Sequence, residues 1–315
     1  MLTKLACLFL LALCSRLEAK PYDETMAKKI LPLASAAYTD DPVPCIKTAY
    51  SNAELVERYE TICDNTNLDT CSGYLALIPF GEGNCCCFSV SFDLEQIAAI
   101  LPKKNFENLG KVNQYFYDAF WALWKAGMGK KFDDLVSNSK YQNYNLWVTG
   151  HSLGWYLDTN ICLKLHLGAA ISSLASVKII NDYPQRFNMD NSYHYNYGFV
   201  FKIMQIDVKA MFRQPRIGDK QFSTSHVNKI PDFWRLTHRS DLVTMLPEMK
   251  YGFIHFQREV WYNNTMSKGS AYIFCEIEND PKCSGPPRLD WEDHRHYFGI
   301  KVPEDASANG CSVAL

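Results

Sequence analysis

Residues 145–154 have the sequence Asn145-Leu146-Trp147-Val148-Thr149-Gly150-His151-Ser152-Leu153-Gly154. The apolar run before Gly150 is typical of a short strand, and the Gly-x-Ser-x-Gly spacing directly after it is typical of a sharp turn into a helix. Such a turn exposes the serine hydroxyl, which is a poor nucleophile until a histidine can accept its proton. The two glycines let the turn close, and the Leu153 N–H can point at a developing oxyanion. The stretch predicts a nucleophile elbow at Ser152, and a glycine turn with a surface serine is the alternative.

Strands and helices alternate around this stretch. The spacing of apolar residues predicts helices over residues 24–37, 52–63, 112–126 and 130–137, and strands over residues 73–79, 87–92 and 144–149. Such alternation favours an α/β fold, with helices on the faces of the sheet. Because no Gly/Ser/Pro-rich linker interrupts the sequence, we expect residues 20–315 to form a single domain.

An elbow of this kind needs an acid and then a histidine further along the chain. Residues 233–238 have the composition of a strand, so Asp241 should lie at the carboxyl edge of the sheet, where α/β proteins collect catalytic groups. An aspartate that caps a turn is the alternative reading of Asp241. Near the C-terminus, His294 is the candidate base, although His296 could serve on spacing alone.

The other polar residues near these motifs have simpler expected roles. We expect His151 to point away from the serine, and His238 and His255 to pack or form hydrogen bonds beside the acid. Asp293 is expected to be a solvated loop residue. His294 and His296 lack further ligands for a metal site, and no zinc-type Cys/His spacing is present, so no metal and no cofactor is expected.

The composition of the chain limits the classes of function that it can have. The chain has 315 residues, of which 47% are hydrophobic and 21% charged, which is enough apolar material for a full-sized core. Its formal charge of −2 offers no positive field for a nucleic acid or an anionic membrane. The composition therefore favours a globular protein that binds no nucleic acid.

The N-terminus and the cysteines favour an oxidising compartment. Residues 1–19 have the pattern of a signal peptide, in which Lys4 precedes a short apolar run and Ala19 stands at a plausible cleavage point. No later stretch reaches the roughly 18 apolar residues of a membrane span. Twelve cysteines are many for a cytosolic chain of this length, and Asn263 begins a glycosylation sequon. We therefore expect a secreted, extracellular protein.

Four motifs carry a resemblance to a known family. In chain order they are Val148-Thr149-Gly150-His151-Ser152-Leu153-Gly154, Gln214-Pro215-Arg216-Ile217-Gly218-Asp219, Thr237-His238-Arg239-Ser240-Asp241-Leu242-Val243 and His294-Arg295-His296-Tyr297-Phe298-Gly299. With them the chain resembles the fungal-type (class 3) lipases, and it looks nearest to their secreted nematode members. These lipases are α/β-hydrolases, with a mostly parallel central sheet and helices on both faces, and they cleave triacylglycerols and related carboxylic esters.

The resemblance assigns roles to individual residues. It implies that Ser152 is the nucleophile, Asp241 the orienting acid and His294, rather than His296, the base. It also suggests two disulfides, and the short spacing of a further pair allows a third. The implied disulfides join Cys45 to Cys311 and Cys63 to Cys71, and the third would join Cys275 to Cys283.

Three stretches depart from the family pattern. Residues 155–167 separate the elbow from a run of small residues at 168–176 that is similar to the start of the family's helix. The Arg-Gly-Ser/Thr element that supplies a second oxyanion donor is missing, so that donor is unassigned. Residues 192–205 look surplus. Cys7 and Cys14 belong to the predicted signal peptide, and the four remaining cysteines outside the three pairs fall in two of these stretches: Cys85, Cys86 and Cys87 in residues 81–96, where the tripeptide is missing, and Cys162 in residues 155–167.

Two functions remain open. The first is a secreted serine hydrolase, a triacylglycerol lipase or carboxylesterase that works through an acyl-enzyme on a lipid or small ester, in solution or at a lipid–water interface. The alternative is a catalytically weakened or inactive lipase-like secreted protein that binds lipid.

Overall fold

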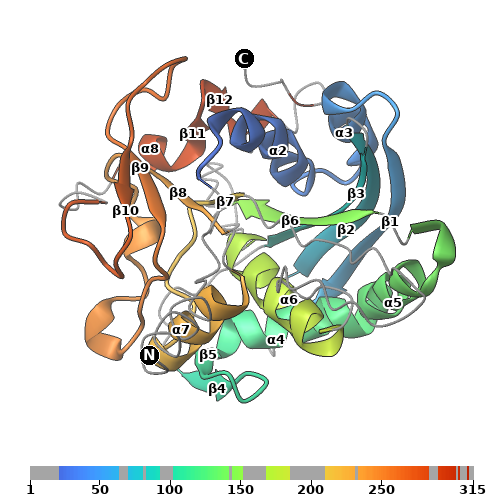
Figure 1. Cartoon of the computed structure of the whole chain (residues 1–315), viewed down its shortest axis with the longest axis horizontal. Coiled ribbons are helices and arrows are strands. Elements are labelled where there is room, and N and C mark those ends of the chain that lie inside the picture. The colour runs from blue at the N-terminus through green and yellow to red at the C-terminus, as the bar shows by residue number, and fades with distance from the viewer. Residues whose placement is uncertain are drawn as a thin grey trace, which may run out of the picture.

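A mixed sheet forms the centre of the protein (Figure 1). The computed structural model describes residues 21–63, 70–80, 83–92, 102–141, 144–151, 168–184, 210–230, 233–283, 290–302, 304–305 and 311. Within these residues eight strands lie in the order β1-β2-β3-β6-β7-β8-β9-β10. Their bounds are β1 Glu54–Ile62, β2 Thr70–Phe80, β3 Gly83–Phe92, β6 Asn145–His151, β7 Ala210–Phe212, β8 Arg235–His238, β9 Glu259–Tyr262 and β10 Ile273–Cys275.

The middle of the sheet is parallel. Strands β3, β6, β7, β8 and β9 pair in parallel, whereas β1, β2 and β3 form an antiparallel meander at one edge and β10 pairs antiparallel with β9 at the other. The carboxyl ends of parallel strands meet at one edge of a sheet, and ligands bind there in open α/β folds. The carboxyl ends of β6, β7, β8 and β9 therefore lie at one edge of the sheet.

Helices cover both faces of the sheet (Figure 1). Helices α2 (Glu24–Ala36) and α3 (Val43–Ala49) lie on one face, with the C-terminal α8 (Trp291–Arg295) and the β11–β12 hairpin (His296–Tyr297 and Ile300–Lys301) on the same side. The other face carries α4 (Gln114–Leu123), α5 (Gly129–Ser137), α6 (Gly168–Asp182) and α7 (Lys220–Lys229). A π-helical turn, Trp124–Met128, joins α4 to α5, and a small hairpin of β4 (Lys103–Asn105) and β5 (Lys111–Asn113) precedes α4.

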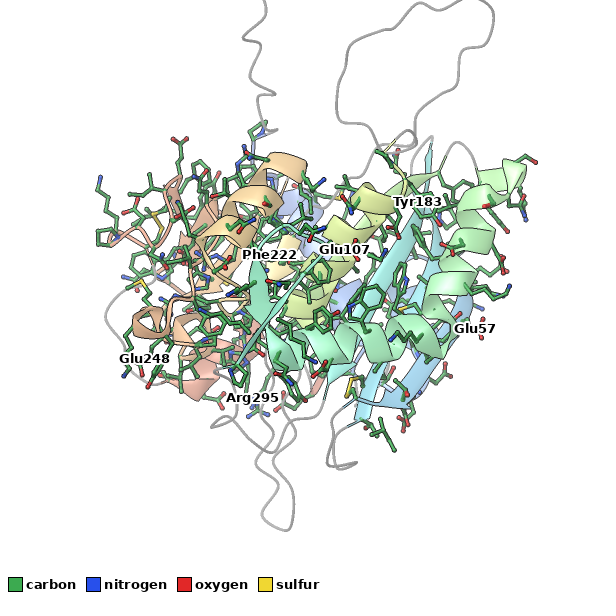
Figure 2. The ribbon with its side chains drawn as sticks, turned by 90° about the horizontal axis from the view of Figure 1, so that it is seen from below. Glu57, Glu107, Tyr183, Phe222, Glu248 and Arg295 are labelled. Carbon is green, nitrogen blue, oxygen red and sulfur yellow. A yellow bond between two sulfur atoms is a disulfide. The ribbon has the colours of Figure 1, made fainter. Side chains whose placement is uncertain are left out.

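Alternation along the strands divides the core into two layers. In β6, Trp147 packs with the α2 side, while Leu146 and Val148 pack with the side of α4 and α6. On that second side lies Phe222 of α7, which is labelled in Figure 2 and is fully buried. Its ring meets that of Phe106 edge-on. Burial on both faces is what a central strand of a parallel sheet requires.

Most predicted elements are present, with shifted ends. The helix predicted over residues 112–126 begins two residues later, at Gln114, because Asn113 closes β5 and its side chain caps the helix by accepting from the Tyr115 and Phe116 N–H groups. The strand predicted over residues 144–149 extends to His151. The small-residue run at 168–176 lies in α6.

The helix predicted over residues 52–63 is wrong. This segment forms β1, which pairs with β2 from Glu54 opposite Leu77 to Ile62 opposite Thr70. Its apolar residues fit a helical period, but a long ladder of hydrogen bonds to a neighbour distant in sequence satisfies the backbone equally well, and β-branched and aromatic residues suit a strand. Tertiary pairing therefore overrides the local pattern.

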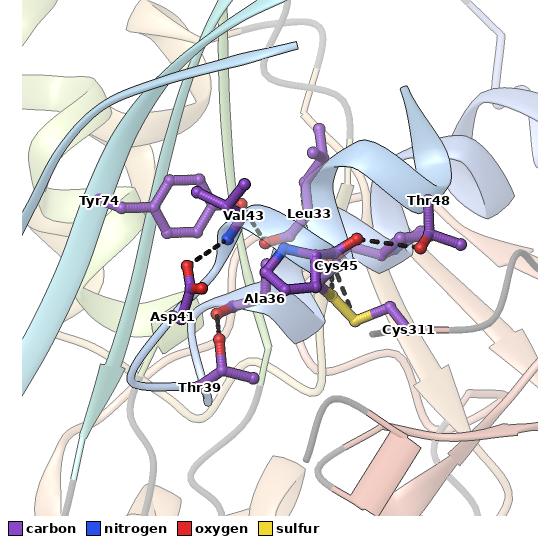
Figure 3. The surroundings of a disulfide bond; sticks show 11 residues. Leu33, Ala36, Thr39, Asp41, Val43, Cys45, Thr48, Tyr74 and Cys311 are labelled. Carbon is purple, nitrogen blue, oxygen red and sulfur yellow. Dashed lines mark hydrogen bonds between the residues drawn. A yellow bond between two sulfur atoms is a disulfide. The ribbon is translucent and has the colours of Figure 1, made fainter. Parts of the chain in front are cut away.

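The three predicted disulfides are present. Cys45 of α3 is bonded to Cys311 and ties the helical layer on the α2 side to the C-terminal segment, 266 residues away in sequence (Figure 3). Near this bond the Tyr74 hydroxyl of β2 donates a hydrogen bond to the Leu33 carbonyl of α2.

The other two bridges, Cys63–Cys71 and Cys275–Cys283, each close a short loop between residues 8 positions apart. None of the described helices is long and apolar enough to cross a membrane.

Candidate active site

The end of β6 and the start of α6 lie in tight contact. A Cβ atom on Gly150 would stand only 2.4 Å from the carbonyl carbon and oxygen of Gly168, so no other residue fits at this position without a shift of the backbone. The Ser172 hydroxyl of α6 donates to the Thr149 carbonyl at 2.6 Å. This close strand-to-helix packing is the arrangement that a nucleophile elbow requires, and it forms although 16 residues separate His151 from Gly168.

Several predicted positions lie outside the described residues. These include Ser152 and Leu153 of the elbow and the whole of residues 155–167. The surplus residues 192–205 also lie outside them. His151 is therefore the last described residue before the predicted nucleophile.

Asp241 lies where the sequence predicted it, in the turn after β8. Its Oδ1 atom accepts a hydrogen bond from the Val243 N–H at 2.9 Å, and its carbonyl accepts one from the Thr244 hydroxyl. The aspartate thus caps its own turn, as the alternative reading proposed. The same Oδ1 atom also contacts a histidine, so capping and the predicted catalytic contact are combined in one residue.

That histidine is His294, in α8. Its Nδ1 atom lies 2.8 Å from Asp241 Oδ1, and both side chains are 1% exposed. Because a carboxylate only accepts, Nδ1 carries the hydrogen and Nε2 is left to exchange protons with a substrate or nucleophile. His296 instead faces the Glu292 carbonyl, and its side chain is 40% exposed. Of the two candidate bases, His294 is the one beside Asp241.

The acid of this pair is held in its charged form. Burial would raise the pKa of the Asp241 carboxyl, but the adjacent His294 and then the Arg213 guanidinium outweigh burial and hold the pKa below its ordinary value. Arg213 Nε lies 3.9 Å from Asp241 Oδ2, and the Arg213 side chain is completely buried. An ionised acid can orient an imidazole and stabilise its protonated form.

His151 packs beneath this pair and is fully buried. The hydroxyl of Tyr38, which follows α2, lies 2.5 Å from His151 Nδ1 and 3.0 Å from the His151 carbonyl. The ring centroids of His151 and His294 are 6.1 Å apart. Tyr38 therefore fixes the residue that precedes the predicted nucleophile, a role that no sequence motif indicated.

The prediction for Asp293 is wrong. This residue is buried, with 8% of its surface exposed, and its carboxylate lies 3.2 Å from Arg239 Nη1 and 3.4 Å from the Ser240 N–H. Its carbonyl accepts from Arg213 Nη2 at 3.0 Å and contacts His238 Nδ1 at the same distance. Asp293 is not solvated because α8 docks directly on the turn that carries Asp241.

His238 and His255 lie beside the acid turn, as predicted. The Nε2 atom of His238 contacts the Asn264 carbonyl at 2.6 Å, and that of His255 contacts the Thr244 carbonyl. Burial lowers the pKa of both imidazoles. Within the described ranges no cluster of three or more His, Cys, Asp or Glu side chains could hold a metal ion.

Comparison with known proteins agrees with this architecture. The model of the family "Lipase (class 3)" matches residues 91–155 and 166–251. A lipase of Caenorhabditis elegans is 27% identical over 339 aligned positions, which cover 95% of this chain and 85% of the nematode protein. A lipase of Rhizomucor miehei is 26% identical over 193 positions, and the match spans 61% of this chain but only 44% of the fungal protein.

Solved structures show the fold. Lipase II of Rhizopus niveus superimposes with a TM-score of 0.64 at 19% identity, covering 89% of this chain and 97% of that one. A mono- and diacylglycerol lipase of Aspergillus oryzae gives the same TM-score at 17% identity, with coverages of 90% and 99%. The fold is that of an α/β-hydrolase.

Within that class, the chain belongs to the class 3 lipase family. The family match skips residues 156–165, which fall inside the stretch that separates the elbow motif from α6. Class 3 lipases as a family hydrolyse lipid esters.

Proposed function

We propose that this chain is a secreted serine hydrolase that cleaves carboxylic esters of lipids through Ser152, Asp241 and His294. One observation carries the proposal, namely the buried 2.8 Å contact between Asp241 and His294 at the sheet edge where β6 ends. The tight packing of Gly150 against Gly168 supports an elbow at the next residues.

The proposed reaction follows from this geometry. The Ser152 hydroxyl attacks the ester carbonyl while His294 Nε2 takes its proton, and the Leu153 N–H stabilises the oxyanion. The tetrahedral intermediate expels the alcohol, which receives the proton from His294, and leaves an acyl group on Ser152. Water, deprotonated by His294, then hydrolyses this acyl-enzyme and restores the serine. Asp241 keeps the imidazole oriented and offsets its charge in both halves.

The compartment is a second part of the proposal. We infer that residues 1–19 are a signal peptide and that residues 20–315 form one class 3 lipase-like domain. Three disulfides support an oxidising environment. Asn263, at the end of β9, is exposed, as a glycan requires. A mass loss on treatment with an N-glycosidase, absent in Asn263→Gln, would support glycosylation, and equal masses would contradict it.

The test compares two histidines in one short segment. We expect His294→Gln to lower hydrolysis of emulsified triacylglycerol and of a soluble p-nitrophenyl ester by about 10³-fold or more, because the proton acceptor is lost. His296→Gln is the matched control, since His296 is exposed and away from Asp241, and it should keep full activity.

The competing function has its own readout. If the wild-type protein co-sediments with the emulsion but hydrolyses neither ester, it is a lipid-binding relative without activity, and the hydrolase proposal fails. Retained hydrolysis in Ser152→Ala would equally contradict the assignment of the nucleophile.

A further inference from the structure

Arg213 is a buried cation for which neither the sequence motifs nor the reaction described above has a use. It follows β7 directly, and its backbone φ of 57° lies in the left-handed region. A side chain in this region costs about 1 kcal/mol or more, so it persists where contacts over-determine it. Its side chain has no exposed surface.

The guanidinium of Arg213 lies beside Asp241 and donates to the residue that precedes His294. Its Nη2 donates to the Asp293 carbonyl, one residue before His294, at 3.0 Å. Its Nε faces Asp241 Oδ2 at 3.9 Å, on the side of the carboxylate that His294 leaves open. The guanidinium carbon also lies 4.6 Å from the ring centroid of Tyr297, in the strand that follows α8.

The carboxylate of Asp241 offsets the positive charge of Arg213. Among the described residues, Nε and Nη1 of Arg213 have no hydrogen-bond acceptor, and Asp241 Oδ2 has no donor, so the two groups balance each other by charge alone. A buried cation without a counter-charge costs several kcal/mol, and therefore an ionised Asp241 is favoured.

The other groups around Arg213 offset little of this charge. Burial raises the pKa of Tyr297 well above its ordinary value and lowers that of His238, so both are neutral near pH 7. The Asp293 carboxylate is already paired with Arg239. Among the described residues, the Tyr38 hydroxyl and the imidazole of His151, which contact each other, also lie beside the pair.

We propose that Arg213 is a positioning residue for the catalytic pair: it keeps Asp241 ionised, anchors the carbonyl before His294, and opposes protonation of His294. The proposal rests on the proposed function for the identity of the pair. It adds that the basicity of His294 is set by two opposite charges, Asp241 on one side and Arg213 behind it. Because the cation disfavours an imidazolium, His294 stays available as a base at lower pH.

The test titrates His294 directly by NMR in the full disulfide-bonded protein labelled at histidine, with the resonance assigned through His294→Gln. In Arg213→Met the midpoint of the His294 titration should rise by at least about half a pH unit, which corresponds to about 0.7 kcal/mol, because the cation that donates to the carbonyl of the residue before His294 is lost. Arg213→Lys keeps the charge and should leave the midpoint within about a quarter of a unit of the wild type.

The matched control is Arg216→Met. Arg216 is a buried arginine in the same turn, but it donates to the carbonyls of Met245 and Pro247 and does not touch the pair. An unchanged midpoint in Arg213→Met, or an equal rise in Arg216→Met, would overturn the proposal. If Arg213→Met does not fold, Arg213→Lys decides: a midpoint that rises in this variant shows that the charge is not what matters.

A second readout separates this proposal from the proposed function. The acid limb of the kcat/KM profile for a soluble ester should move to higher pH in Arg213→Met together with the NMR midpoint. A wild-type protein that hydrolyses no ester would refute the proposed function, while the NMR midpoints would still decide whether Arg213 opposes protonation of His294.

Discussion

Replacing Gly150 by alanine tests the junction on which the predicted elbow depends. Gly150 is the next-to-last residue of β6, and it faces the first residues of α6. The substitution adds one methyl group and changes no charge, so any effect must come from steric contact. It also leaves the predicted nucleophile and its acid and base unchanged.

The size of the effect follows from three distances. The added Cβ would lie 2.4 Å from both the carbonyl carbon and the carbonyl oxygen of Gly168 and 2.7 Å from the Ala169 nitrogen. Ordinary contact begins near 3.4 Å, so the start of α6 must move by about 1 Å, and these are backbone atoms that cannot rotate away. Overpacking of this kind costs about 3 kcal/mol, which in a domain of about 300 residues lowers the Tm by about 5 °C.

The assay measures Tm together with the rate at which a fluorophosphonate labels the protein. A displacement of about 1 Å at the nucleophile should slow labelling by about 10- to 100-fold. Gly269→Ala is the control, because nothing lies within 4 Å of the added methyl group and only its φ of 77° is strained. If Gly150→Ala unfolds at the wild-type temperature and is labelled at the wild-type rate, the reasoning about this junction is refuted.

Two further predictions concern stability. Removing the Cys45–Cys311 disulfide should lower the free energy of unfolding by about 3 kcal/mol more than removing Cys63–Cys71. The reason is that the entropy of loop closure grows as 1.5RT ln n, and the sequence separations are 266 and 8. Urea unfolding of the two double-alanine variants measures the difference, and equal losses would contradict the prediction. His226 is buried among phenylalanine rings, and burial lowers its pKa to about 3. The unfolded imidazole binds a proton below about pH 6.5 and the folded one does not, so His226 alone should lower the free energy of unfolding by about 2 kcal/mol between pH 7.5 and 5. His226→Phe should lose this share of the decline, while the buried His238 and His255 keep theirs; a decline as large in the variant as in the wild type would contradict the prediction.

The sequence predicted the parts of the molecule that depend on local order. The strand before Gly150, the turn that holds Asp241 and the histidine near the C-terminus are each signalled by a few adjacent residues, and the chain order of the motifs fixes which edge of the sheet they share. The resemblance named His294 rather than His296 as the base, and His294 is the one of the two that lies beside Asp241.

What the sequence could not predict depends on contacts between distant segments. Residues 52–63 have apolar spacing compatible with a helix, and only the neighbouring β2 turns them into a strand. Asp293 and Arg213 are charged residues that would ordinarily be solvated, and they are buried because α8 docks on the turns that follow β7 and β8. Tyr38 reaches His151 across 113 residues of sequence, a distance at which no local pattern gives a signal.

The most direct test of the central claim is the site of covalent labelling. The disulfide-bonded protein is treated with a fluorophosphonate, digested and mapped by mass spectrometry. We predict about one adduct per chain, on Ser152, and greatly slowed labelling in His294→Gln because the serine then lacks its base. A folded protein that takes up no adduct, or takes it up on another residue, would contradict the assignment of this chain as a serine hydrolase acting through Ser152, Asp241 and His294.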